Sequence, residues 1–486
     1  MIITGSSPGV RAGDATARLL VSTLCLDVIV LSLIQTLVVP ALTEIAGQLH
    51  TTAATVGWAV TANLLAAAVL TPLLGRLGDL RGKRRVLLGV LAVVVAGSLL
   101  AAATASVPLL ILGRVLQGAS YGIFPLTMGV LRDEIRTDRL TFAMAVVSGM
   151  LGLGSGLGVG LAGMLTRNHG DYHQIFWLAT VAGFLALLLT AAAVPHRDGH
   201  ASGTVDWFGA GLLGAALVLL LLPLSEGNDW GWTSAATLCC FTACAVLFAV
   251  WLGVENRVGT PLVAPRLLAH RPVLITNLAG LFLGVGMFTG FLGISHLVET
   301  PRAEAGYGFS ASVLAASNVY LLPGVVAGVL VVPFGGRVVR RHGGQATLLA
   351  ATVLGVTGFA LLALLHDATW EVILGGVIVN LSITFGYAAI PPLLVLAVPP
   401  GETAIANSIN SIARTVGSAL ASAMTVTLLT SRLLPMGMTR ESSYTIAFAI
   451  AAAGYTVAGL LVGLGLKSGH RLEPADPGRP PVMSAA

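Results

Sequence analysis

The sequence predicts an all-α polytopic membrane protein, with fourteen transmembrane helices that form two six-helix halves and one additional pair. Three observations lead to this fold class: the small charged fraction, the number of long apolar segments, and the side on which basic residues lie. Only 10% of the 486 residues are charged and 56% are hydrophobic, whereas soluble proteins carry about 25% charged residues. A soluble multidomain protein is therefore excluded.

Fourteen segments are long enough to cross a bilayer core, which takes about 20 apolar residues as a helix. They must be helical, because backbone polar groups in lipid have to be paired within the segment. The first segment is too long for the apolar part of a cleaved signal peptide, so we expect it to remain as a span. The approximate limits are 19–43, 54–74, 86–106, 109–131, 141–165, 174–194, 207–225, 235–254, 273–298, 311–334, 346–365, 371–397, 403–430 and 444–466.

Basic residues lie mainly on one side of this arrangement. If both termini are cytoplasmic, the inner segments hold 20 Lys and Arg residues, the outer loops hold 4, and the spans hold 2. The positive-inside rule then places both termini in the cytoplasm. We expect a multi-pass protein of the cell membrane, surrounded by lipid and acting as a monomer.

A short sequence echo indicates an internal repeat. "PLLGRLGDLRG" begins at Pro72 and "PFGGRVVRRHG" begins at Pro333, and both have Gly-Arg at +3 and +4 and Gly at +10. The two copies end the second and the tenth span, an offset of eight spans. A repeat of six spans would place the second copy at the eighth span, so two extra helices are inserted between the halves. Repeats of this kind are typical of transporters. The expected divisions are a cytoplasmic N-terminus (1–18), a six-helix half (19–194), inserted helices 7 and 8 (195–272), a second half (273–466) and a flexible tail (467–486).

The loop after the second span, "GRLGDLRGKRR" (75–85), carries five basic residues and one acid. A phosphate loop has four residues between its first Gly and its Gly-Lys pair, and Ser or Thr follows. Here three residues separate Gly78 from the Gly-Lys pair at 82–83, and Arg84 follows, so the loop does not bind phosphate in this way. It is too short and too close to the membrane for nucleic acid. Its carboxylate could pair with an Arg or lie at a helix N-terminus, and its glycines would let two helix ends approach closely. We expect a cytoplasmic gate at Gly75, Asp79, Gly82 and Arg84.

This loop resembles a known family signature. Gly75, Leu77 and Asp79, followed by the Gly-Lys-Arg of 82–84, resemble the cytoplasmic loop motif of the major facilitator superfamily. The echo, with Arg340 where the acid would fall, is also usual for that superfamily. The resemblance extends over 19–466 and implies the major facilitator fold, with transport by alternating access of two six-helix halves.

The fourth span contains a charge, Arg114. A charged side chain inside the membrane is costly unless it is paired or solvated, so a functional role is expected by default. Gln117 and Tyr121 follow at +3 and +7 on the same face. The stretch is similar to the fourth-span signature of the superfamily, which implies that the Arg takes part in proton coupling. The alternative is an Arg that extends to the outer surface.

The first span contains Asp27, the only acid well inside any of the fourteen segments, with Gln35 on the same face. A carboxylate there could take and release a proton or meet a cationic substrate; the alternative is an acid held by interfacial water. The stretch resembles the first-span motif of the fourteen-span drug:proton antiporter family, including its Pro at Pro40. The resemblance implies proton coupling through Asp27, with Arg114 as the partner that tunes it.

The fifth span, "SGMLGLGSGLGVGLAG", has two rows of small residues that permit close helix packing. It resembles the fifth-span signature of the same antiporters, but Val159 stands where that signature has Pro. Without the Pro the helix should kink less. This departure from the exporter signature keeps an uptake permease as an alternative function. We expect helix packing at Gly152, Gly156, Gly158 and Gly163.

Polar residues on the twelfth and thirteenth spans predict a substrate cavity. Arg414 lies near the middle of its span, where it could pair with Asp27 or bind an anionic group of a substrate. His296 and Glu299, at the outer end of the ninth span, receive no assigned role. The expected cavity residues are Gln35, Gln117, Tyr121, Asn380, Tyr387, Asn410 and Arg414.

The resulting hypothesis is a secondary transporter that exports a small hydrophobic or amphipathic compound, of the drug or antibiotic kind, in exchange for protons. A lipid or lipid-precursor flippase and a proton-coupled uptake permease are the alternatives. An enzyme is not expected, because no nucleophile elbow or nucleotide loop is present. Neither a metal nor a cofactor is expected, because the four cysteines lie in apolar runs without the spacing of a zinc site.

Overall fold

The computed structural model describes residues 14–165, 170–197, 204–259, 261–431, 434 and 438–466. Within these residues, thirteen helices are long and apolar enough to cross a membrane. One of them, Ala316–Leu364, is 49 residues long and contains two spans, because the backbone at Gly343 is not helical. The all-α fold with fourteen spans is therefore confirmed. The predicted tail (467–486) and most of the predicted N-terminal segment lie outside the described residues.

The helices follow one another along the chain with short connections. The first six spans are α1 (Asp14–Thr36), α3 (Ala53–Arg81), α4 (Lys83–Ala103), α5 with α6 (Val107–Gln117 and Ile123–Glu134, joined by η2, Gly118–Gly122), α7 (Thr137–Leu165) and α8 (His173–Ala193). The next two are α9 (Trp207–Trp230) and α10 (Ala235–Glu255). The last six are α12 (Arg271–Glu299), the two parts of α15 (Leu322–Leu364), α16 (Thr369–Ala397), α17 (Thr403–Ser431) and α18 (Glu441–Gly465).

Shorter elements connect these spans. They are η1 (Val39–Ala41), α2 (Leu42–Gln48), α11 (Pro265–Ala269), α13 (Arg302–Ala305), α14 (Val313–Ala315), η3 (Ala316–Leu321) and η4 (Pro400–Glu402).

The two copies of the sequence echo make the same sharp turn between consecutive spans. Gly82, between α3 and α4, has φ 93°, and Gly343, inside α15, has φ 84°. Glycine adopts such positive φ values without the steric cost that a side chain brings. Both glycines stand at +10 of their copy, so the echo marks the point at which the chain reverses direction.

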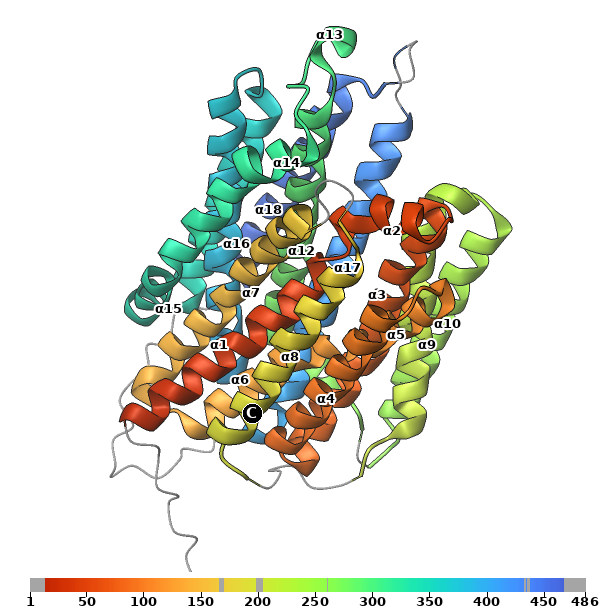
Figure 1. The fold of residues 1–486 in the computed structure, drawn as a ribbon. Helices are drawn as coiled ribbons and strands as arrows, with labels where there is room; N and C mark the ends of the chain where they lie inside the picture. Colours follow the sequence, from red (N-terminus) through yellow and green to blue (C-terminus); the bar gives the residue numbers. More distant parts are fainter. Residues whose placement is uncertain are drawn as a thin grey trace, which may run out of the picture.

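The bundle is arranged so that helices from distant parts of the sequence lie side by side (Figure 1). α3 packs against α17, and α7 packs against α15 and α16. α9 contacts both α3 and α17, whereas α10 packs mainly on α9 and lies at the edge of the bundle. Only 11% of the apolar segment of α10 is buried against the rest of the protein. Most of that helix is therefore available to contact lipid. The division at 195–272 stays a prediction.

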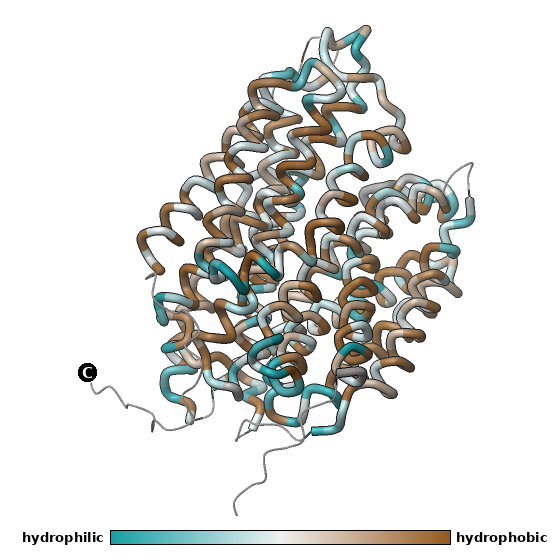
Figure 2. Tube along the Cα trace, turned by 90° about the vertical axis from the view of Figure 1, so that its left-hand side faces the viewer, coloured by the Kyte–Doolittle hydropathy of each residue, from teal (hydrophilic) through white to brown (hydrophobic). Residues whose placement is uncertain are grey.

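Hydrophilic residues lie at both ends of the bundle, and the larger group is at the lower end in Figure 2. We call this the basic end. It contains the turn between α3 and α4, the end of α6 and the beginning of α17, and its cations include Arg81, Lys83, Arg84, Arg85, Arg132 and Arg136.

Two glycines at equivalent positions of the echo allow close approach between distant helices. A Cβ atom at Gly75 of α3 would lie 2.2 Å from Oγ of Ser408 in α17. A Cβ atom at Gly336 of α15 would lie 2.7 Å from the ring of Phe142 in α7. Each copy therefore has a glycine, three residues after its proline, where a larger residue would separate two packed helices.

The fifth span packs through only some of its glycines. A Cβ at Gly158 would lie 2.1 Å from Oγ1 of Thr36 in α1, and one at Gly156 would lie 2.2 Å from Val325 of α15. Apart from the backbone of their own helix, no atom of the described residues lies within 4 Å of a Cβ built at Gly152 or Gly163. The prediction that these two take part in packing is wrong, because they face open space.

Substituting Gly75 should destabilise the contact between α3 and α17. We expect Gly75→Leu to lower the Tm of the purified protein, because overpacking a close contact costs about 1–3 kcal/mol. Gly152→Leu is the matched control, since it makes the same change where no neighbour stands. Thermal unfolding of the two variants side by side tests this, and equal Tm values would contradict it.

Candidate functional site

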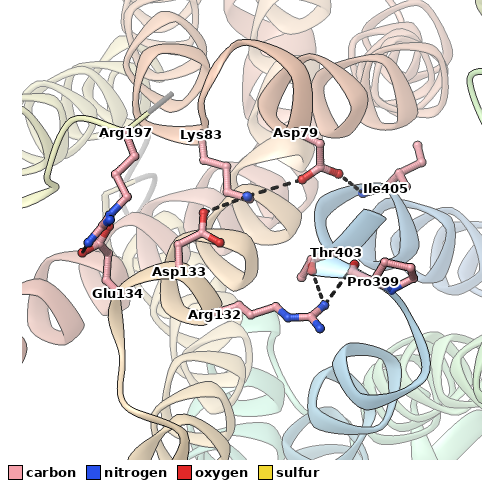
Figure 3. A network of polar contacts seen from close by, with 9 residues as sticks. All are labelled: Asp79, Lys83, Arg132, Asp133, Glu134, Arg197, Pro399, Thr403 and Ile405. Carbon is pink, nitrogen blue, oxygen red and sulfur yellow. Dashed lines mark hydrogen bonds and ion pairs between the residues drawn. The ribbon is translucent and has the colours of Figure 1, made fainter. Parts of the chain in front are cut away.

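A carboxylate at the basic end joins two helices that are distant in the sequence. Asp79, near the end of α3, is fully buried, and its Oδ2 accepts a hydrogen bond from the backbone N–H of Ile405 at 3.2 Å. Ile405 lies in the first turn of α17, where backbone N–H groups have no partner within the helix. A negative charge there is also favoured by the helix dipole. Asp79 therefore links α3 to α17 (Figure 3).

Two cations complete this contact (Figure 3). Nζ of Lys83 lies 3.5 Å from Asp79 and 2.8 Å from Asp133 at the end of α6, and its side chain is only 3% exposed. Arg132 of α6 donates to Oγ1 of Thr403 at 2.5 Å. It also donates to the carbonyls of residues 398 and 399, just before α17. The beginning of α17 is thus held by α3 and α6 together.

Arg84, which we expected in this gate, lies elsewhere. Its Nη2 donates to the carbonyl of Ala191 at 2.7 Å, at the end of α8, and it therefore satisfies a helix C-terminus. A second pair nearby joins Arg197 to Glu134, and this carboxylate raises the pKa of Arg197 above its usual value. In the second copy of the echo, Arg340 is exposed. Only the first copy therefore places a buried charged side chain at a helix N-terminus.

Arg132 belongs to this contact with α17 but is absent from the predicted site residues. It was counted only as one of the basic residues of the inner loops. Its place directly before Asp133, at the end of the fourth span, was a usable signal.

Asp27 is fully buried between α1 and α8. Both of its carboxylate oxygens accept from the hydroxyl of Thr190, at 3.0 and 2.9 Å. Among the described residues this hydroxyl is the only hydrogen-bond donor to the carboxylate. Thr190 was not predicted, because a lone threonine in an apolar span carries no sequence signal.

Arg114 is buried but does not pair with Asp27. Its guanidinium donates to the carbonyls of Ile34 and Ala59, at 3.1 and 3.2 Å, and to Oε1 of Gln117 at 2.6 Å. Ile34 lies seven residues beyond Asp27, which is about 10 Å along a helix. The predicted tuning contact between the two charges is absent here, and the alternative of an Arg at the outer surface is wrong as well.

Gln117 and Asn410 belong to helix contacts and not to an open cavity. Gln117 donates to Oγ of Ser98 at 2.8 Å while it accepts from Arg114, so both ends of its amide are occupied. Asn410 donates to the carbonyl of Thr276 at 3.2 Å, and this bond joins α17 to α12. Both side chains are 1% exposed, which corrects their predicted place among the cavity residues.

Arg414 lies between two aromatic rings. Its guanidinium carbon is 4.9 Å from the ring centroid of Phe124 in α6 and 4.8 Å from that of Tyr387 in α16. Nη2 donates to Oγ of Ser411 at 3.0 Å. Asp27 is not among its contacts, so the predicted pairing of the two is not formed. Phe124 was missed, because a phenylalanine in an apolar run is not distinctive.

The remaining predicted cavity residues are partly exposed and differ in their surroundings. Tyr121, in η2, is close enough to Arg114 and Arg414 to interact electrostatically with both. Asn380 faces α15, where its Oδ1 would lie 2.5 Å from a Cβ at Gly328. Gln35 is partly exposed in α1.

Another acid, Glu226, lies near the end of a membrane-spanning helix. α9 continues to Trp230, five residues beyond the predicted end, and therefore includes Glu226. Its carboxylate accepts from Oγ1 of Thr61 in α3 at 3.4 Å. The predicted seventh span ends at 225 and excludes Glu226, whereas this acid lies within α9, four residues before its end at Trp230.

Comparisons with known proteins relate this arrangement to one family. The model of the Major Facilitator Superfamily matches residues 24–422. The chain is 29% identical over 357 residues to the uridine/deoxyuridine transporter of Lactococcus lactis, covering 71% of this chain and 72% of that protein. It is 27% identical over 426 residues to the tetracenomycin C resistance and export protein of Streptomyces glaucescens, covering 83% and 74%.

A solved structure shares the fold. The human organic anion transporter MFSD10 superposes with a TM-score of 0.63 and 16% sequence identity, over 92% of this chain and 99% of that chain. Identity this low shows the fold alone. Together with the match over residues 24–422 and the many membrane-spanning helices, it leads to one conclusion: the chain belongs to the Major Facilitator Superfamily and is a multi-pass membrane transporter.

Proposed function

We propose that this transporter exports small hydrophobic or amphipathic compounds of the antibiotic kind across the cell membrane, in exchange for protons. The basic end faces the cytoplasm, as the positive-inside rule requires. The substrate passes between the first six and the last six spans, which rock against each other. The similarity to a tetracenomycin C export protein supports this class of substrate.

The observation that carries the proposal is the isolated carboxylate of Asp27. It is fully buried, and its hydrogen bonds come from one hydroxyl, that of Thr190. An ionised acid without a cationic partner is costly inside a membrane, whereas a protonated acid is tolerated there. A carboxylate in this position can therefore bind a proton from one side and release it when the surroundings become wetter.

The contact at the basic end supports alternating access. Asp79 and Arg132 hold α17 in this conformation, and we infer that this contact closes the path to the cytoplasm between these helices. Opening requires that the backbone N–H of Ile405 separates from its carboxylate acceptor. Water can replace that acceptor, which makes the contact reversible.

A proton-coupled uptake permease is the second candidate. The 29% identity to a uridine/deoxyuridine transporter favours uptake as much as the similarity to the tetracenomycin C export protein favours export. On this alternative the same buried carboxylate would bring protons and substrate inward together.

Transport by inside-out vesicles separates the two candidates. Under an imposed pH gradient we expect vesicles with the wild-type protein to accumulate tetracenomycin C and not uridine. Asp27→Asn should lower the accumulation about tenfold or more, because the amide of Asn, unlike a carboxyl group, does not bind and release a proton at the pH of the vesicles. Asp171→Asn is the control, since it makes the same change at an exposed acid before α8.

Gradient-driven accumulation of uridine in right-side-out vesicles would instead establish uptake. Undiminished export by Asp27→Asn would remove this residue from the coupling step.

Weakening the contact at α17 should open the basic end. Asp79→Asn removes a charge worth about 1 kcal/mol at a helix N-terminus, which shifts the equilibrium toward the open form by about fivefold. The measurement is labelling of Ser408→Cys, on a background without native cysteines, by a membrane-impermeant thiol reagent.

The control for this measurement is Arg340→Gln, which changes the equivalent but exposed position of the second copy. We expect faster labelling with Asp79→Asn and no change with Arg340→Gln. Equal rates in both would mean that Asp79 does not hold the closed form.

A further inference from the structure

Within the part of the chain that the structure describes, no acid interacts with Arg414, a cation inside a membrane-spanning helix. Arg414 lies eleven residues into α17, which spans Thr403–Ser431. The charged or titratable groups that interact with it are Tyr387 and Tyr121. A charge at this depth is costly unless a partner or water compensates it. The other buried charges do not provide one, because Asp27 is bound by Thr190 and Arg114 is itself a cation.

The aromatic rings hold the guanidinium without neutralising it. Phe124 and Tyr387 lie within 5 Å of its carbon atom, a distance at which ring faces attract a cation by about 0.5–2 kcal/mol each. The two rings belong to α6 and α16, so the side chain is positioned by both groups of six spans. Its position is therefore set even though its charge remains unpaired.

Part of the guanidinium is available to a ligand. One of its nitrogens donates to Ser411, and the others find no acceptor among the described residues. None of these donors is fully enclosed, and the residue is partly exposed. A guanidinium offers parallel N–H groups that match the two oxygens of a carboxylate.

The neighbouring Arg114 shows the contrast. It is 1% exposed, and its guanidinium donates to two backbone carbonyls and to Gln117. Those acceptors bind Nε and Nη1, so two of the three nitrogens of Arg114 are bonded within the first six spans. In Arg414 only Nη2 has an acceptor among the described residues, so this arginine keeps more of its donors free.

We propose that Arg414 binds the acidic group of the substrate, and that the substrate is an aromatic carboxylate whose apolar body lies against Tyr121, the partly exposed ring beside this cation. This rests on the proposed transport function, since the ligand is the compound that is carried. The aromatic body follows from the rings around the cation, because aromatic surfaces pack well on one another. Met287, which accepts from the hydroxyl of Tyr387, adds an adaptable apolar wall.

A matched pair of small ligands tests the proposal on the full-length protein in detergent. 1-Naphthoate and 1-naphthamide have the same ring system and nearly the same size, and differ in charge. We expect 1-naphthoate to bind wild-type protein at least about tenfold more tightly, which corresponds to 1.4 kcal/mol. Quenching of intrinsic fluorescence and the shift of Tm measure both ligands under the same conditions.

Variants identify the cation. Arg414→Gln should bind 1-naphthoate no better than 1-naphthamide, whereas Arg414→Lys should keep part of the preference for the acid. Arg257→Gln is the matched control, because this arginine is exposed and lies after α10. It should bind both ligands as wild type does.

Equal affinity of wild-type protein for the acid and the amide would overturn the proposal, and this comparison needs no variant to fold. A preference for the acid that survives in Arg414→Gln would overturn it too. Binding is measured without a membrane gradient, so these outcomes are independent of proton coupling. If vesicles show no gradient-driven export while the preference for the acid persists, the proposed function fails and the assignment of Arg414 stands.

Discussion

The N-terminus of α17 is the point on which the closed arrangement of this transporter depends. A helix that begins in the interior of a bundle leaves backbone N–H groups without partners, and burying them unpaired costs free energy. Asp79 supplies the acceptor from α3, and Arg132 binds the carbonyls and hydroxyl just before the helix. Gly75, one turn earlier in α3, lets the two helices come close enough for this bond. The same polar groups can be taken over by water when the helices separate.

The buried charges of the spans are compensated in three different ways. Asp27 receives a hydroxyl, Arg114 receives backbone carbonyls, and Arg414 receives aromatic faces. These partners differ in how easily the charge can change or be used. A carboxylate with one weak partner is suited to exchange a proton, a guanidinium bonded through two of its nitrogens is held in place, and a guanidinium between rings retains the capacity to bind an anion.

The pair α9–α10, at the edge of the bundle, forms hydrogen bonds to helices of both groups of six spans. α9 presents Glu226 to Thr61 of α3, and near its end Asn228 accepts from Thr427 of α17 at 2.7 Å. Trp232, just after α9, donates to the same threonine hydroxyl at 3.0 Å. The pair is therefore bonded to helices of both groups at the end opposite to the basic one, so a rocking motion has to change at least one of these contacts.

Composition and local pattern determined those features that depend on single stretches of about 20 residues and not on contacts between distant stretches. The number of spans and the basic end could be predicted, because they depend on hydropathy and charge. The echo marked Gly82 and Gly343 as equivalent positions, and the structure showed that both have positive φ. The acid at the N-terminus of a helix was among the expected possibilities, since its chemistry is local to the motif.

Tertiary structure alone decided which groups meet. Asp27 and Thr190 are 163 residues apart, and Asp79 and Ile405 are 326 residues apart. Spans that are apolar on all sides give little periodic signal for which face points where, so helix packing was predicted at Gly152 and Gly163, where no other described element comes close. The same ambiguity hid Phe124, Thr190 and the true partners of the buried arginines, because a membrane helix does not reveal its neighbours by sequence alone.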